Sequence, residues 1–184
     1  MSVKDAIMAA LDASPNDTVR GRTLLQKKLY FVSVLTGEDF GYEPYFYGPY
    51  SSLVADELGA LESAGFIEEQ AQPLYLAGPF GDRYRYDYQL TSDSKAFIDL
   101  RHEEMTPYQA ALARVNSHPV SDNSLLLSVA AKVHLIVSEQ GKASITQVRE
   151  RAQQLGWNLS KDDVKAVAQY LEQLGLLKWA AAGR

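Results

Sequence analysis

The sequence predicts a mainly α-helical α+β fold with small β-hairpins, built from two winged-helix-like units in tandem. Three observations predict this class. Amphipathic helix patterns occur in two series, the first series is followed by a β-hairpin pattern, and both series end on one motif, LESAGFI at 61–67 and LEQLGLL at 171–177. In each motif a helix tail meets a glycine and two apolar residues, which is typical of a helix closed by a left-handed glycine cap.

The first unit is expected over residues 1–100. Apolar residues at helical spacing predict helices over 3–13 and 23–36, the second with Gln26 and Lys27 off its apolar stripe. The aromatic segment FGYEPYFYGPYSS contains two prolines and is expected to be extended, with a turn near its end. A third helix then follows, with Ser51 or Ser52 as its cap and Gly65 as its stop.

Strand patterns come after the third helix. A strand is expected to begin at residues 66–67, and the runs 74–77 and 83–91 flank the turn sequence GPFGD. In the second run, tyrosines and Leu90 alternate with charged or polar residues, which predicts a hairpin strand with two different faces. Three helices followed by a hairpin is the order of a winged helix-turn-helix.

Residues 101–123 are predicted to connect the two units. Helical patterns cover 94–104 and 107–115, and the stretch NSHPVSDNS lacks apolar periodicity, which indicates a linker and a domain boundary near residue 120. The second unit, 124–184, carries helix patterns over 125–139, 144–155 and from a Ser160 cap to Leu171.

Composition excludes several classes of protein. The chain has no cysteine, which removes disulfides, cysteine-bound zinc and thiol nucleophiles and fits a cytoplasmic location. No apolar run is long enough for a membrane span, and Asp5 interrupts the apolar residues that a secretory signal needs. The three histidines lack the spacing of a metal or catalytic motif, and no phosphate-binding or dinucleotide fingerprint is present. We therefore expect no enzyme activity, no cofactor and no metal.

The charge is distributed unevenly along the chain. Residues 1–100 contain 8 Lys/Arg and 15 Asp/Glu, whereas residues 101–184 contain 10 and 8, within a total net charge of −5. No Lys or Arg occurs between Lys28 and Arg83, so the third helix has three carboxylates and no cation. DNA phosphates would repel such a helix, which argues against it as a DNA-recognition helix.

Tyrosines are concentrated where the cations are missing. Nine of the eleven fall between residues 30 and 88, and tyrosine is favoured at protein interfaces. We therefore predict a protein-binding surface that contains Tyr45, Tyr47, Tyr50, Asp56 and Glu57. The expected partner is a toxin, a protease, a regulatory protein or a second copy of the chain. The alternative is that about half of these tyrosines fill a small core.

The second hypothesis is a DNA-binding transcriptional regulator. Its nucleic-acid contacts would come mainly from the C-terminal unit, with the hairpin as an accessory; the candidate residues are Arg83, Arg85, Lys142, Arg149, Arg151, Lys161 and Lys165. Carboxylates at Glu150, Asp162 and Asp163 interrupt this set, so an ordinary solvated face with mixed charge remains the alternative.

Two motifs resemble a known family. The matching positions in GRTLLQKKLYFVSVLTG and YEPYFYGPYSSLVADELGALESAGFIEE are Leu25, Gln26, Lys27, Tyr30, Phe31, Tyr47, Gly48, Pro49 and Ser51. Over residues 20–70 the sequence resembles the YwgA-like bacterial and archaeal family and, more distantly, the SocA-like (Panacea) antitoxin domain. The resemblance implies a non-catalytic domain that acts through protein contacts, as an antitoxin or a proteolysis adaptor.

Overall fold

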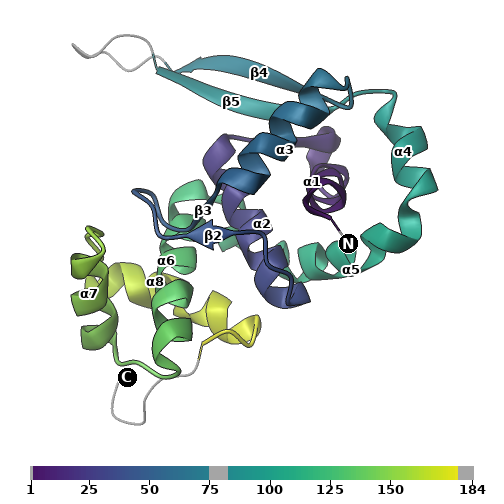
Figure 1. Ribbon diagram of the computed structural model, residues 1–184. Coiled ribbons are helices and arrows are strands. Elements are labelled where there is room, and N and C mark those ends of the chain that lie inside the picture. Colours follow the sequence, from purple (N-terminus) through teal and green to yellow (C-terminus); the bar gives the residue numbers. More distant parts are fainter. Residues whose placement is uncertain (1, 75–82, 178–184) are drawn as a thin grey trace.

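The computed structural model describes residues 2–74 and 83–177 of the chain. These residues form a mainly α-helical fold with two small antiparallel sheets, which confirms the predicted α+β class (Figure 1). In chain order the elements are α1 (Val3–Asp12), η1 (Pro15–Asp17), β1 (Thr18–Arg20), α2 (Arg22–Thr36), β2 (Tyr42–Glu43), β3 (Tyr50–Ser51), α3 (Ser52–Ser63), β4 (Ile67–Leu74), β5 (Arg83–Leu90), α4 (Ser94–Leu100), α5 (His102–Val115), η2 (Pro119–Asp122), α6 (Ser124–Gln140), α7 (Ile145–Gln154) and α8 (Lys161–Gln173).

Side-chain caps mark where several of the helices begin. The Ser51 hydroxyl accepts a hydrogen bond from the Val54 backbone N–H and starts α3. Ser160 and Asp163 form a complete capping box at the start of α8, as the sequence predicts. Ser144 and Gln147 form the same arrangement at α7. Each cap satisfies backbone N–H groups that the first helical turn leaves free.

Left-handed glycines end the helices of both predicted units. After α3 the backbone N–H of Phe66 donates to the Leu61 carbonyl across Gly65, and after α8 Leu176 donates to Leu171 across Gly175. The two motifs seen in the sequence therefore have the same geometry. Because α7 also ends this way, at Gly156, the shared ending is a general feature of this chain.

The larger sheet has the strand order β1-β5-β4. The strands β4 and β5 pair from Ile67↔Leu90 to Leu74↔Arg83, so the first strand of the hairpin is 67–74. The expected start at residues 66–67 is correct. Of the strand-like run expected over 74–77, Leu74 is described and pairs with Arg83, whereas residues 75–77 and the turn GPFGD lie outside the described residues. Strand β1, on the other side of β5, was not predicted.

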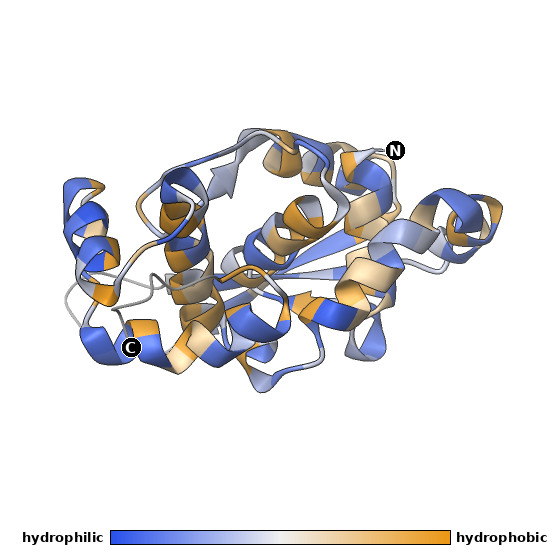
Figure 2. Cartoon of the chain, turned by 90° about the horizontal axis from the view of Figure 1, so that it is seen from below, coloured by the Kyte–Doolittle hydropathy of each residue, from blue (hydrophilic) through white to orange (hydrophobic). Residues whose placement is uncertain are grey.

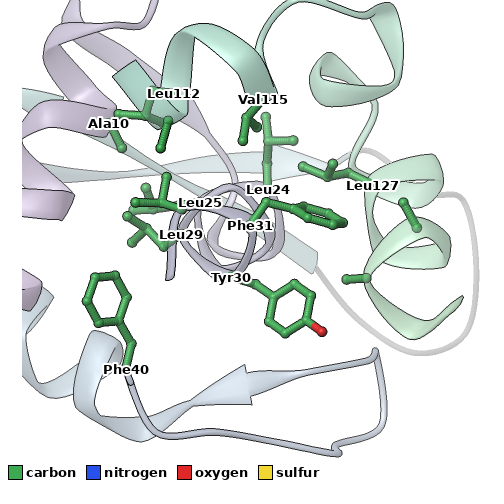
Figure 3. Close-up of a cluster of buried hydrophobic side chains, with 14 of the residues drawn as sticks. Ala10, Leu24, Leu25, Leu29, Tyr30, Phe31, Phe40, Leu112, Val115 and Leu127 are labelled. Atoms are coloured by element: carbon green, nitrogen blue, oxygen red, sulfur yellow. The ribbon is translucent and has the colours of Figure 1, made fainter. Parts of the chain in front are cut away.

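Helix α2 is surrounded by other elements. Figure 3 shows it end-on, with Leu25, Phe31 and Tyr30 pointing in different directions into the core. Every residue from Leu24 to Ser33 is buried, including Gln26, Lys27 and Lys28. The expectation that Gln26 and Lys27 lie off a buried stripe is therefore wrong, because α2 packs on all sides, as an interior helix does.

Two corrections concern the middle of the chain. The break between its helices falls at Arg101, and α5 then continues through Pro107. Proline has no N–H to donate to the carbonyl four residues earlier, but Pro107 lies on the exposed side of α5, where water can bond that carbonyl. The expected linker forms the short helix η2, whose Val120 and Ser121 are buried against α2 and α6. The division into units that fold separately stays a prediction.

The hydrophobic residues of both halves meet in one buried cluster. Figure 2 shows helices of both halves with one hydrophobic and one hydrophilic side. None of the described helices is long and apolar enough to cross a membrane.

Candidate interaction site

The loop between β2 and β3 exposes three consecutive aromatic side chains. Tyr45, Phe46 and Tyr47 are 54%, 78% and 73% exposed, and we call residues 44–49 the aromatic loop. The Tyr45 ring lies 5.0 Å from the Phe46 ring and 5.2 Å from the Tyr50 ring, measured between centroids. Contiguous exposed aromatic surface is uncommon on a monomer and marks binding sites.

Hydrogen bonds from the C-terminal half fix the backbone of this loop. The indole N–H of Trp157 donates to the Tyr45 carbonyl at 2.7 Å, and the Ser128 hydroxyl donates to the Tyr47 carbonyl at 2.6 Å. Gly48 has a φ of +98°, and a Cβ atom there would lie 3.0 Å from the Lys132 side chain. The loop thus needs glycine at this close approach, and it is held in one conformation against α6 and the α7–α8 turn.

Helix α2 holds the other end of the loop. The Gln26 amide donates to the Ser51 carbonyl at 2.9 Å and accepts from the Ser51 N–H at 3.1 Å. The Lys27 ammonium donates to the Pro49 carbonyl at 2.5 Å. These bonds show that the Leu-Gln-Lys motif and the Tyr-Gly-Pro motif are one structural unit, in which the helix positions the loop.

The side chain that holds the loop at Pro49, Lys27, is a buried ammonium group. It is 2% exposed, and its ammonium has the Pro49 carbonyl as its one hydrogen-bond partner among the described residues. Burial, and to a smaller degree the charge of nearby Lys132, lowers the pKa of Lys27 to about 8. Lys132 itself lies over the Trp157 ring, with its ammonium 5.6 Å from the ring centroid.

We expect the Lys27 ammonium to titrate near pH 8 in the native protein, which NMR of ¹³C-labelled lysine side chains can measure. The unfolded chain keeps this proton up to about 10.5, so the free energy of unfolding should rise between pH 8 and 10.5. The Lys27→Met variant assigns the signal and should lack this rise. A Lys27 signal that titrates near 10.5 in the folded protein would contradict the expectation.

The predicted protein-binding residues separate into two groups. Tyr45, Tyr47 and Tyr50 belong to the aromatic loop and its β3 end, whereas Asp56 and Glu57 line a hollow with Lys4, Phe97 and Arg101. The most exposed aromatic residue of the loop, Phe46, is absent from the predicted residues, because that prediction rested on the concentration of tyrosines. Trp157 was also missed, because no local pattern connects it to a loop more than a hundred residues away.

The candidate DNA-contacting cations differ in availability. Arg85 is paired with Asp87 at 2.7 Å, Arg151 with Glu139 at 3.2 Å, and the Arg149 guanidinium donates to the Leu159 carbonyl at 3.0 Å. Within residues 2–74 and 83–177, Lys142, Lys161 and Lys165 are exposed and have no ion-pair partner. The side chain of Arg83 lies outside the described part of the structure.

Comparison with known proteins gives one informative similarity. No protein-family model matches the sequence, and none supports the SocA-like resemblance. The chain is 24% identical over 163 residues to the uncharacterized protein YwgA of Bacillus subtilis (strain 168), a similarity that covers 88% of this chain and 90% of that protein. The similarity therefore extends beyond residues 20–70 to most of the chain, and the name of that protein states no activity.

Proposed function

We propose that this protein is a YwgA-like, non-enzymatic adaptor or regulator, of antitoxin type, whose aromatic loop binds another protein. The observation that supports this most directly is the exposure of Tyr45, Phe46 and Tyr47 on a loop that both halves hold in place. The expected partner is a toxin, a protease or a regulatory protein. The absence of cysteine fits work in the reducing cytoplasm.

The energetics of protein interfaces support this use of the loop. Aromatic residues at the centre of an interface supply most of its binding energy, and each can contribute 2 kcal/mol or more, about a thirtyfold change in affinity. A loop already fixed by Trp157, Ser128 and Gln26 loses little conformational entropy on binding. The aromatic side chains that a partner would bury are thus already positioned before binding.

The order of elements supports a winged-helix-like first unit. The helices α1, α2 and α3 are followed by the β4–β5 hairpin, and β1 joins the hairpin through β5. In this interpretation α3 takes the place of the recognition helix, but it carries Asp56, Glu57 and Glu62 and no cation. Such a unit suits contacts with protein better than contacts with DNA.

The test places a photo-crosslinking amino acid at position 46 and, as a matched control, at position 100. Leu100 is 82% exposed and lies between Asp99 and Arg101 in the sequence, so it controls for apolar exposure without a run of aromatic residues. In the native host we expect a discrete protein adduct from position 46 and none from position 100. Binding of that protein should weaken at least about thirtyfold in the Tyr45→Ser/Phe46→Ser/Tyr47→Ser variant.

Two outcomes would overturn the proposal. One is an identical set of adducts from positions 46 and 100, which would mean unspecific contact. The other is an adduct partner whose affinity is unchanged by the triple substitution. The Leu100→Ser/Leu125→Ser variant removes two other exposed apolar side chains and should bind the partner as the wild type does.

The alternative is a DNA-binding regulator that uses the C-terminal helices. Lys161 and Lys165 favour it, because they lie one turn apart on α8 and are exposed without an ion-pair partner among the described residues. Micromolar binding to duplex DNA that falls steeply with salt, and that weakens in Lys161→Gln/Lys165→Gln, would support this function over the first.

A further inference from the structure

A cleft of about 560 Å³ lies on the side of β1, between the first turns of α2 and the start of α6. Its walls combine apolar residues such as Pro15, Val19 and Leu24 with three cations and one carboxylate. That volume is within the usual range of about 300–1,000 Å³ for small-molecule sites. The aromatic loop contributes no residue to it, so the cleft is separate from the proposed protein-binding site.

The three cations come from three different elements. Lys28 of α2 is 4% exposed, and its ammonium donates to the Asn116 amide oxygen at 2.7 Å. Arg85 of β5 is oriented by Asp87, which accepts from its Nε and one Nη at 2.7 and 2.8 Å and leaves the other Nη without a partner among the described residues. Arg20 of β1 is exposed and has no ion pair within the same residues.

The single carboxylate of the cleft is loosely held. Asp122 has its oxygen 3.7 Å from the Lys28 ammonium, beyond hydrogen-bond distance, and its side chain is 80% exposed. A buried ammonium gains most from a close oxygen anion, and Asp122 leaves that position incompletely filled. An incoming acid can therefore replace Asp122 beside Lys28 at little cost, since the displaced carboxylate is already hydrated.

We propose that this cleft binds a small phosphomonoester, with its dianionic phosphate between Lys28, Arg20 and Arg85 and its organic part against Pro15 and Leu24. Two guanidinium groups and an ammonium that line one cleft from separate elements match the several oxygens and the double charge of such a phosphate. The apolar wall gives the remainder of the ligand a surface to bury. The ligand would make this a small-molecule-regulated protein.

The experiment measures binding by isothermal titration calorimetry at constant ionic strength with three probes: inorganic phosphate, phenyl phosphate and adenosine 5′-monophosphate. Phenol and adenosine are the matched uncharged compounds. We expect at least one phosphomonoester to bind and both uncharged compounds to fail. Because the organic part adds contacts, that phosphomonoester should bind more tightly than inorganic phosphate.

Variants distinguish this site from general attraction of anions. Arg20→Gln should weaken phosphomonoester binding at least tenfold, and so should Lys28→Met. Lys161→Gln, which removes one exposed positive charge on α8, should leave binding unchanged. Asp122→Asn should strengthen binding several-fold because it removes the competing carboxylate. Arg20 has no partner to lose among the described residues, so its result stands even if Lys28→Met folds poorly.

Three results would overturn the proposal. In the first, none of the three phosphate probes binds the wild type or Asp122→Asn. In the second, Arg20→Gln and Lys161→Gln weaken phosphomonoester binding equally. In the third, the protein binds duplex DNA, Arg20→Gln abolishes that binding, and phosphomonoesters do not bind. None of them bears on the aromatic loop, whose crosslinking test has a separate readout.

Discussion

Replacing Phe31 with alanine is expected to lower the free energy of unfolding by about 3–5 kcal/mol, the usual cost of deleting a buried aromatic ring. Phe31 is fully buried on α2, the helix at the centre of the core (Figure 3). Its ring meets the Tyr170 ring of α8 edge to face at 5.6 Å, and it lies 6.1 Å from the His134 ring of α6. The cavity therefore opens between the two halves of the chain.

The position of the Phe31 ring between the two halves also predicts that they unfold in a single transition. Both tryptophans of the sequence fall within residues 124–184, so their fluorescence follows this half and, through Trp157, its contact with the aromatic loop, whereas far-UV circular dichroism reports on all helices. Because Phe31 packs on α8, we expect the two signals to share one urea transition in the wild type and to shift together in Phe31→Ala.

Phe46→Ala is the matched control, because it removes the same ring from a position that is 78% exposed. It should change the free energy of unfolding by less than about 0.5 kcal/mol. Two separate transitions, with tryptophan fluorescence unaffected by Phe31→Ala, would show that residues 124–184 fold as an independent unit.

Local signals in the sequence were sufficient for most of the helices. Apolar spacing together with Ser51, Ser160 and the glycine stops located α3, α6 and α8 to within about two residues, because caps and left-handed glycines act on their own helix. Strand β1 was missed because three residues carry no periodicity, and pairing with β5 defines it. The helix break at Arg101 was also missed, because that residue is held by an interaction with α1.

Prediction of the candidate site was limited by the same physics. The run of aromatic residues was visible in the sequence, and it does lie at the surface. The residues that hold it were not visible, because Gln26 and Lys27 have the polarity of exposed residues and are buried only through their bonds to Ser51 and Pro49. Trp157 is equally hidden, since its one informative contact joins segments that are distant in sequence.

The second large effect is expected at the contact between α1 and Arg101. Asp5 is fully buried, and its carboxylate accepts two hydrogen bonds from the Arg101 guanidinium, both at 2.8 Å, and one from the Ser2 hydroxyl at 2.8 Å. Asp5→Ala should lower the free energy of unfolding by about 2–4 kcal/mol, because it removes both close hydrogen bonds of the guanidinium and leaves it only the longer 3.5 Å ion pair with Glu104. Arg101 is about one-third exposed and can be partly rehydrated, which keeps the cost below that of a fully buried pair.

The pH dependence identifies the cause of this effect. Burial raises the pKa of Asp5, but the hydrogen bonds from Arg101 and Ser2 and the Arg101 charge outweigh it, so the pKa lies below its ordinary value of 3.8. A carboxyl with a lowered native pKa stabilises the fold above pH 3.8, and this contribution is lost as the pH falls through the native pKa.

The difference in unfolding free energy between wild type and Asp5→Ala should therefore be constant near neutral pH and shrink below about pH 4. Urea titrations at several pH values measure it. Asp12→Ala is the control, because Asp12 faces Lys95 at 3.7 Å on the surface and should cost less than about 1 kcal/mol. If the loss of unfolding free energy in Asp5→Ala stayed the same in strong acid, the prediction would be contradicted. Packing at this position, and not the charge of Asp5, would then hold α1 against Arg101.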